Sequence, residues 1–98
     1  MEKLLADLNT QLKLLNFTKD NSEGIIEKGN VEGVERQLQS LKSIITRVED
    51  FKLQIEQTKI ANGEKLDDVS QWSLTVEAWQ TSADENVTYL QKWLKEYK

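Results

Sequence analysis

Apolar residues recur at alternating spacings of three and four along three long stretches of this chain, and two Gly/Asn breaks separate the stretches. The last stretch is the most regular, because Val69, Val76, Ala83 and Leu90 follow one another every seven residues. Such spacing lines up apolar side chains along one side of an α-helix. The pattern therefore predicts long helices that pack against one another along their length.

Few residues are available to make turns. The chain has four glycines and no proline, whereas a fold of short strands needs a turn signal every eight to twelve residues. Short connections at Gly29-Asn30 and Asn62-Gly63 make neighbouring helices antiparallel. We therefore expect an all-α fold, an elongated antiparallel three-helix bundle with coiled-coil-like packing. It forms a single domain over residues 1–98, with helices at about residues 2–28, 31–61 and 65–97.

Two places leave the continuity of these helices open. Residues 20–24 read Asp-Asn-Ser-Glu-Gly, a poor helical stretch, so the first helix is open to a break within residues 19–24. Ser82 is followed three residues later by Glu85, a pattern that also starts helices, so a break near residues 81–83 is the second candidate. The heptad phase continues across Ala83, and it favours an unbroken third helix.

The missing residue types exclude most chemistry. Without histidine or cysteine, the chain has no imidazole base, no thiolate nucleophile, no disulfide and no Cys- or His-based zinc site. The acid pairs Asp67-Asp68 and Asp84-Glu85 are sequence neighbours, whose side chains diverge by about 100° on a helix. They do not converge on one substrate atom. We therefore expect no enzymatic activity, no metal and no cofactor.

The charges also limit the partners. The net charge is −4, and the 13 lysines and arginines are scattered among 17 acids, which argues against nucleic-acid binding. No apolar run approaches the roughly 18 residues that span a bilayer, and residues 1–17 interleave leucines with charges, unlike a signal peptide. We therefore expect an intracellular, cytoplasmic chain whose partner is a protein, either a second copy in a homodimer or another helical protein.

Aromatic residues mark the third stretch. Trp72, Trp79, Asn86 and Trp93 form a second row with seven-residue spacing, and Tyr97 extends the row of Leu90. In a narrow bundle such a row is expected to form the core, yet large aromatic side chains are also enriched in the centres of protein interfaces. The candidate core or interface anchors are Trp72, Trp79, Trp93 and Tyr97.

Polar residues interrupt the apolar rows at one height of the bundle. Aligning the segments by their loops places Lys19 and Ser22 near Asn86, with Gln37 and Ser40 of the middle segment at a similar height. A polar layer of Lys19, Ser22 and Asn86 would fix the register of the helices at some cost in stability. On this reasoning, Asn86→Leu should raise the melting temperature.

These features favour a non-catalytic module for protein association, in which apolar positions supply affinity and polar positions select register and partner. Single bundles of this size and composition are marginally stable alone, and self-association would stabilise them. The alternative is a carrier of a small molecule or lipid, with the tryptophans lining a cavity between the helices.

Two resemblances accompany this interpretation. Residues 48–77, which include EDFKLQI, KIANGE and DDVSQWS, resemble a helical hairpin near the N-terminus of gag-like polyproteins of invertebrate LTR retroelements. That resemblance implies a region of self-association upstream of a capsid domain. In length and heptad use the whole chain is similar to a spectrin-type three-helix repeat. Spectrin repeats usually carry their characteristic tryptophan in the first helix, and the first segment here has none.

Overall fold

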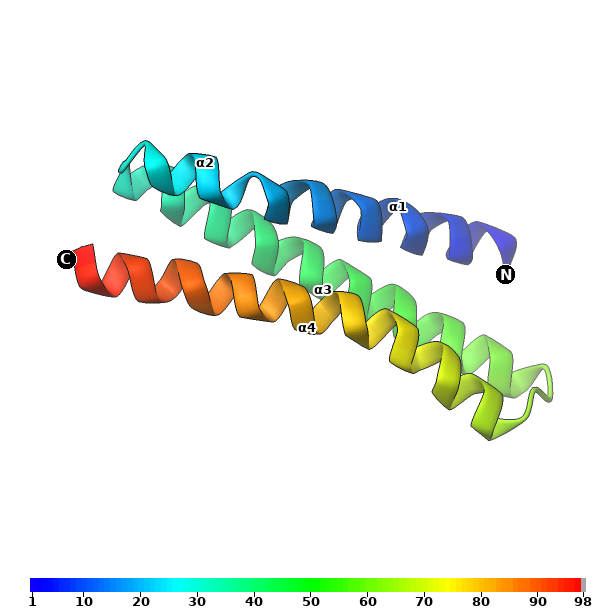
Figure 1. The fold of residues 1–98 in the computed structure, drawn as a ribbon. Coiled ribbons are helices and arrows are strands. Elements are labelled where there is room, and N and C mark those ends of the chain that lie inside the picture. The colour runs from blue at the N-terminus through cyan, green and yellow to red at the C-terminus, as the bar shows by residue number, and fades with distance from the viewer. Residues whose placement is uncertain (98) are drawn as a thin grey trace.

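The computed structural model describes residues 1–97, and these residues are almost entirely α-helical (Figure 1). The helices are α1 (Glu2–Asp20), α2 (Ser22–Glu27), α3 (Val31–Ala61) and α4 (Leu66–Tyr97). α1 and α2 together form the first arm of a bundle, α3 returns antiparallel to it, and α4 is antiparallel to α3. The rod measures 51 × 22 × 15 Å. The prediction of an all-α, elongated, antiparallel three-helix bundle is confirmed.

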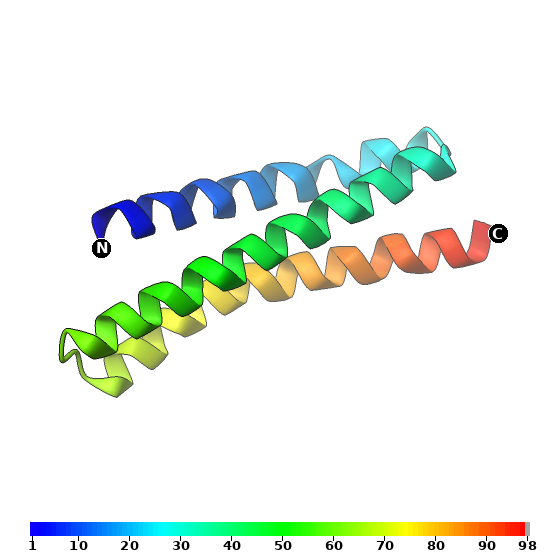
Figure 2. The ribbon, with the colours of Figure 1, turned by 180° about the vertical axis from the view of Figure 1, so that it is seen from behind.

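The long helix α3 is the centre of the packing. Its residues Val34, Leu41, Val48 and Ile55 are spaced by seven and are completely buried. α1 and α4 each pack mainly against α3 and touch one another much less, as the views from both sides show (Figures 1 and 2). The positions of α1 and α4 are therefore set by their separate contacts with α3.

Local sequence signals determine where the arms turn. The side chain of Asn30 accepts a hydrogen bond from the backbone N–H of Gly33 at 3.3 Å, which caps the N-terminus of α3. Gly29 and Gly63 have positive φ angles of 64° and 83°, a conformation that glycine adopts without steric cost. The two Gly/Asn breaks of the sequence are therefore the two reversals of the chain.

The first arm is not one helix over residues 2–28. It breaks at Asn21, whose backbone N–H donates to the carbonyl oxygen of Thr18 at 3.2 Å, three residues back. The amide Nε2 of Gln37 on α3 donates to the same carbonyl at 2.5 Å. A side chain that inserts into the hydrogen-bond ladder of a helix is a recognised cause of a kink. The predicted weak stretch at 19–24 is therefore a real break, and Gln37 helps to place it.

α4 continues without interruption through Ser82 and Glu85, as the heptad phase across Ala83 predicts. Its row of Val69, Val76, Ala83 and Leu90 is buried, which confirms the first apolar row of the third segment. A helix in a three-helix bundle contacts two neighbours, so it buries a wider stripe than a two-stranded coiled coil does. α4 accordingly uses additional positions on both sides of this row.

The central position of α3 leads to a prediction about stability. Leu41→Ala removes a completely buried side chain midway along the shared helix, and we expect it to lower the free energy of unfolding by about 2–5 kcal/mol. Urea unfolding followed by circular dichroism measures this loss. The adjacent exposed residue provides the matched control, since Lys42→Ala should change stability by no more than about 0.5 kcal/mol. Equal effects of the two changes would contradict the central role of α3.

Candidate functional site

The row of tryptophans does not form a continuous core. Trp72 and Trp93 are half-buried and pack against the apolar cluster, whereas Trp79 is 40% exposed and Tyr97 is 60% exposed. The expectation that the row lies in the core is therefore wrong for Trp79 and Tyr97. Both residues remain candidates for an interface.

The deeper second row of α4 is shifted by one residue from the tryptophans. Ser73 and Gln80 are buried beside α3, where each forms a hydrogen bond with a glutamate of that helix. The small side chain of Ser73 and the slender one of Gln80 let the backbones of α3 and α4 approach. Two indoles at these positions would hold the helices further apart. Trp79 instead lines a groove with Leu15 of α1, whereas the ring of Trp72 lies 5.4 Å from Lys59 Nζ of α3.

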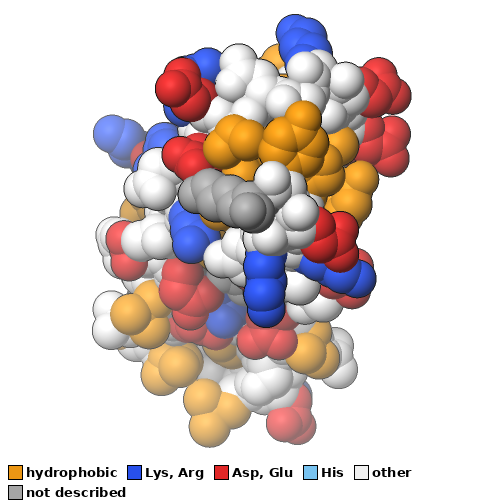
Figure 3. All heavy atoms as spheres, turned by 90° about the vertical axis from the view of Figure 1, so that its left-hand side faces the viewer, with side chains coloured by type: hydrophobic (Ala, Val, Ile, Leu, Met, Phe, Trp, Pro, Cys, Tyr) orange, Lys and Arg blue, Asp and Glu red, His pale blue; other side chains and the backbone are white. Residues whose placement is uncertain are grey.

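One end of the rod carries an aromatic stack. The rings of Trp93 and Tyr97, one helical turn apart, have their centroids 4.6 Å apart and are nearly parallel. Hydrophobic side chains gather at this end, where α4 finishes beside the connection between α2 and α3 (Figure 3). The stack extends the apolar packing of Trp93 into solvent through the exposed ring of Tyr97.

A layer of polar side chains crosses the bundle at the break between α1 and α2. The completely buried Ser22 Oγ donates to Asn86 Oδ1 at 2.7 Å and accepts from Gln37 Nε2 at 3.0 Å. Lys19 Nζ donates to Ser82 Oγ at 2.8 Å on the side of α4. The structure thus brings Ser22 and Asn86 into direct contact and places Lys19 beside them.

The layer differs from the sequence-based expectation in two of its members. Ser40 is exposed and takes no part in it, whereas Ser82 supplies the partner of Lys19. Gln37 bonds both to Ser22 and to the carbonyl oxygen of Thr18, so it joins α3 to both parts of the first arm. The spacing of the loops was sufficient to predict the height of the layer but not the direction of each side chain.

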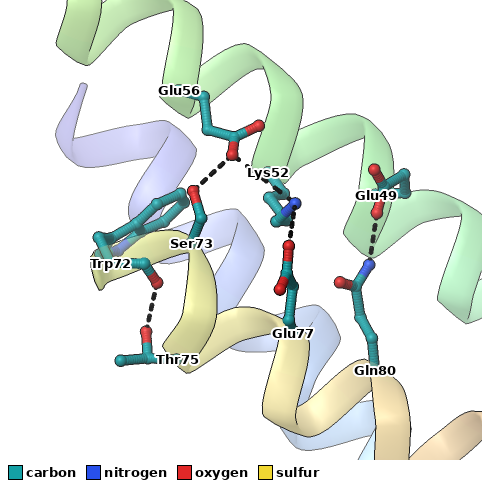
Figure 4. A network of polar contacts seen from close by, with 8 residues as sticks. All are labelled: Glu49, Lys52, Glu56, Trp72, Ser73, Thr75, Glu77 and Gln80. Carbon is teal, nitrogen blue, oxygen red and sulfur yellow. Dashed lines mark hydrogen bonds and ion pairs between the residues drawn. The ribbon is translucent and has the colours of Figure 1, made fainter. Parts of the chain in front are cut away.

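A second polar network joins α3 to α4 nearer the hairpin loop (Figure 4). Lys52 is buried, and its Nζ lies 3.6 Å from Glu56 Oε2 and 3.5 Å from Glu77 Oε1. Ser73 donates to Glu56, and Gln80 Nε2 donates to Glu49 Oε2 at 2.6 Å. A buried ammonium is tolerated because two carboxylates compensate for its lost hydration. A slip of one residue between the helices would separate these partners, so the network specifies their register.

The most apolar surface of the hairpin is a groove between α3 and α4 near their connecting loop. Its volume is about 670 Å³, and we name it the hairpin groove. The large side chains that line it are substantially exposed: Leu53 at 52%, Ile60 at 50%, Leu66 at 66% and Leu74 at 62%. Four aliphatic side chains around one groove are unusual on a surface that only contacts water. The sequence did not predict this groove, because its four large exposed side chains lie outside the apolar rows.

Residues 1–97 contain no group of three acids that could hold a metal ion, and no helix within this range is long and apolar enough to cross a membrane. The groove beside Trp79 holds about 280 Å³ and is open to solvent, below the usual range of ligand pockets.

The bonds of the polar layer reverse the expectation for Asn86→Leu. Removing the acceptor of the buried Ser22 hydroxyl leaves an unsatisfied polar group, so we expect the single change to lower the free energy of unfolding by about 1–3 kcal/mol. Adding Ser22→Ala should recover part of this loss, with a coupling of about 0.5–3 kcal/mol in a double-mutant cycle. Chemical unfolding of the four proteins measures both values. Higher stability of Asn86→Leu alone would contradict this interpretation.

Comparison of the chain with protein-family models, curated proteins and solved structures finds no match. The resemblances of residues 48–77 to a gag-like hairpin and of the whole chain to a spectrin-type repeat therefore remain expectations from the sequence. The conclusions about function rest on the surfaces of this molecule.

Proposed function

We propose that this chain is a non-catalytic protein-association module that binds a second copy of itself through the hairpin groove. The observation that carries the proposal is the exposure of Leu53, Ile60, Leu66 and Leu74 around one groove. Burying such side chains against a partner is favourable by roughly 25 cal/mol for each Å² of apolar surface removed from water. Contact with a partner at this groove would therefore stabilise the complex.

The shape and composition of the bundle support self-association. The rod is only 15 Å thick in its narrowest dimension and has two helices packed on one side of a third, so its core is a thin seam. Small domains of this kind bury a modest fraction of their surface and are marginally stable alone. Contact between two copies would bury more apolar surface and so stabilise the bundle, without the need for a different protein.

The alternative of a small-molecule or lipid carrier has less support. Trp72 and Trp93 pack against the apolar cluster, and the groove beside Trp79 is small and open. The tryptophans therefore do not line a roomy cavity between the helices of the kind that this alternative requires.

The proposal predicts a concentration-dependent mass. Light scattering from micromolar to millimolar concentrations should give a mass that rises above 11.4 kDa for the native sequence. Leu53→Ser combined with Leu74→Ser should keep the mass at that of one chain, because both changes place hydroxyls in the apolar groove. Circular dichroism should show unchanged helix content, since both side chains are exposed.

A matched control lies on the other side of α4. Tyr89 is 46% exposed and lines a groove that faces α1 and α2, away from the hairpin groove. Tyr89→Ser should therefore leave association unchanged. A native protein that stays at the mass of one chain at every concentration would overturn the proposal, and so would a Leu53→Ser/Leu74→Ser variant that associates as strongly as the native protein.

A further inference from the structure

The outer surface between α3 and α4 becomes acidic next to the hairpin groove. A second groove, of about 460 Å³, is lined by Glu49 and Asp50 of α3 and by Glu77 and Asp84 of α4. Glu77 also lines the hairpin groove, so the two grooves are continuous. None of the described residues that line the acidic groove is a lysine or an arginine. An apolar surface thus continues directly into a negatively charged one.

A different groove along α3 carries the complementary arrangement. A groove of about 510 Å³ between α1 and α3 is lined by Arg36 and Arg47 together with Leu14 and Ile44. No aspartate or glutamate is among the described residues that line this basic groove. Phe17 is 66% exposed and lies three residues from Leu14, which makes the two side chains neighbours on the surface of α1.

The charges of both grooves are available for contacts outside the chain. Within residues 1–97 the ion pairs involve Lys52 and Lys59 with glutamates, and Arg36, Arg47, Asp50 and Asp84 form none at 4.0 Å or less. Glu49 and Glu77, by contrast, are already bonded to Gln80 and Lys52. Two arginines without an ion pair therefore line the groove beside α1, and two aspartates without an ion pair line the groove beside α4.

The two rows of charged residues differ in length by about 6 Å. Arg36 and Arg47 are eleven residues apart on one helix, a separation of about 16 Å at 1.5 Å per residue. Glu77 and Asp84 are seven residues apart, about 10 Å, on a helix that borders the acidic groove. Arginine side chains are long and flexible, so their head groups can converge on the shorter span. Leu14 and Phe17 then lie beside the pair of arginines, as the hairpin groove lies beside the acids.

We propose that copies of this chain associate head to tail, with the basic groove of one copy on the acidic and hairpin grooves of the next. The inference deepens the proposed self-association by naming both halves of the contact. Arg36 and Arg47 pair with Asp50 and Asp84, while Leu14 and Phe17 cover the aliphatic side chains of the hairpin groove. The contact joins two different surfaces, so each copy keeps one free surface of each kind.

Head-to-tail association predicts two properties of the protein in solution. Unless the rotation between copies closes a ring, head-to-tail contact yields chains that lengthen with concentration, whereas a symmetric contact stops at a dimer. Opposite charges attract less strongly as ions screen them, so raising NaCl from about 0.05 M to about 0.5 M should shorten the chains. A purely apolar contact would not weaken in this way.

Two complementary variants test the inference. Arg36→Glu/Arg47→Glu blocks the basic groove and Asp50→Lys/Asp84→Lys blocks the acidic groove, and each variant keeps the other surface intact. Each alone should therefore remain at the mass of one chain. An equimolar mixture should regain association, because the intact grooves of the two variants pair and their two reversed grooves also carry opposite charges.

The control changes charge elsewhere by the same amount. Lys92 and Lys95 are exposed near the end of α4, and Lys92→Glu/Lys95→Glu matches the charge change of the double arginine variant. This control should still form chains. Circular dichroism and urea unfolding should show that every variant is folded, since all the substituted side chains are exposed.

The outcomes separate this inference from the proposed function. A native protein that never exceeds the mass of one chain overturns both. If the native protein associates and the two groove variants associate equally well when unmixed, the head-to-tail contact is wrong and self-association through the hairpin groove stands. Single-chain mass for each variant, followed by association on mixing, supports the inference directly.

Discussion

The structure depends on the continuous buried row of α3. Val34, Leu41, Val48 and Ile55 recur at the heptad spacing, and each is completely removed from water. The other two arms find their positions by packing against this helix, since they contact one another only slightly. The same dependence explains the grooves on either side of α3, because two helices packed on a third leave its outward-facing surface open between them. A compact core and accessible grooves are therefore two results of one arrangement.

Apolar rows alone do not select a single register, and polar residues perform this task in the bundle. Gln37 holds the first arm through Ser22 and the carbonyl of Thr18, while Lys52 holds α4 through Glu77. Both residues lie in α3 and face different neighbours. Each costs desolvation, and each would lose its partners if a helix shifted by one turn. The polar residues therefore lower the stability of the apolar core, and in return they specify one alignment of the three arms.

Much of the fold follows from one-dimensional spacing, because burial along a helix repeats with a known period. The buried row at Val69 and the height of the layer at Ser22 could both be predicted in this way. Spacing does not say on which side of α4 each neighbour lies, so it could not place Trp79 at the surface. It also could not predict how the break at Asn21 forms, since Gln37 contributes from sixteen residues further along the chain.

The charges of α3 show why the candidate contact could not be predicted from composition. Residues 31–62 contain five acids and five bases, and their net charge of zero suggests no electrostatic role. Folding sorts these residues by side, so that Arg36 and Arg47 border α1 while Glu49 and Asp50 border α4. Groups that cancel in a sum along the sequence are thereby divided between two grooves. A neutral helix can in this way present one charge to each of two partners, provided that a neighbouring arm keeps the two surfaces apart.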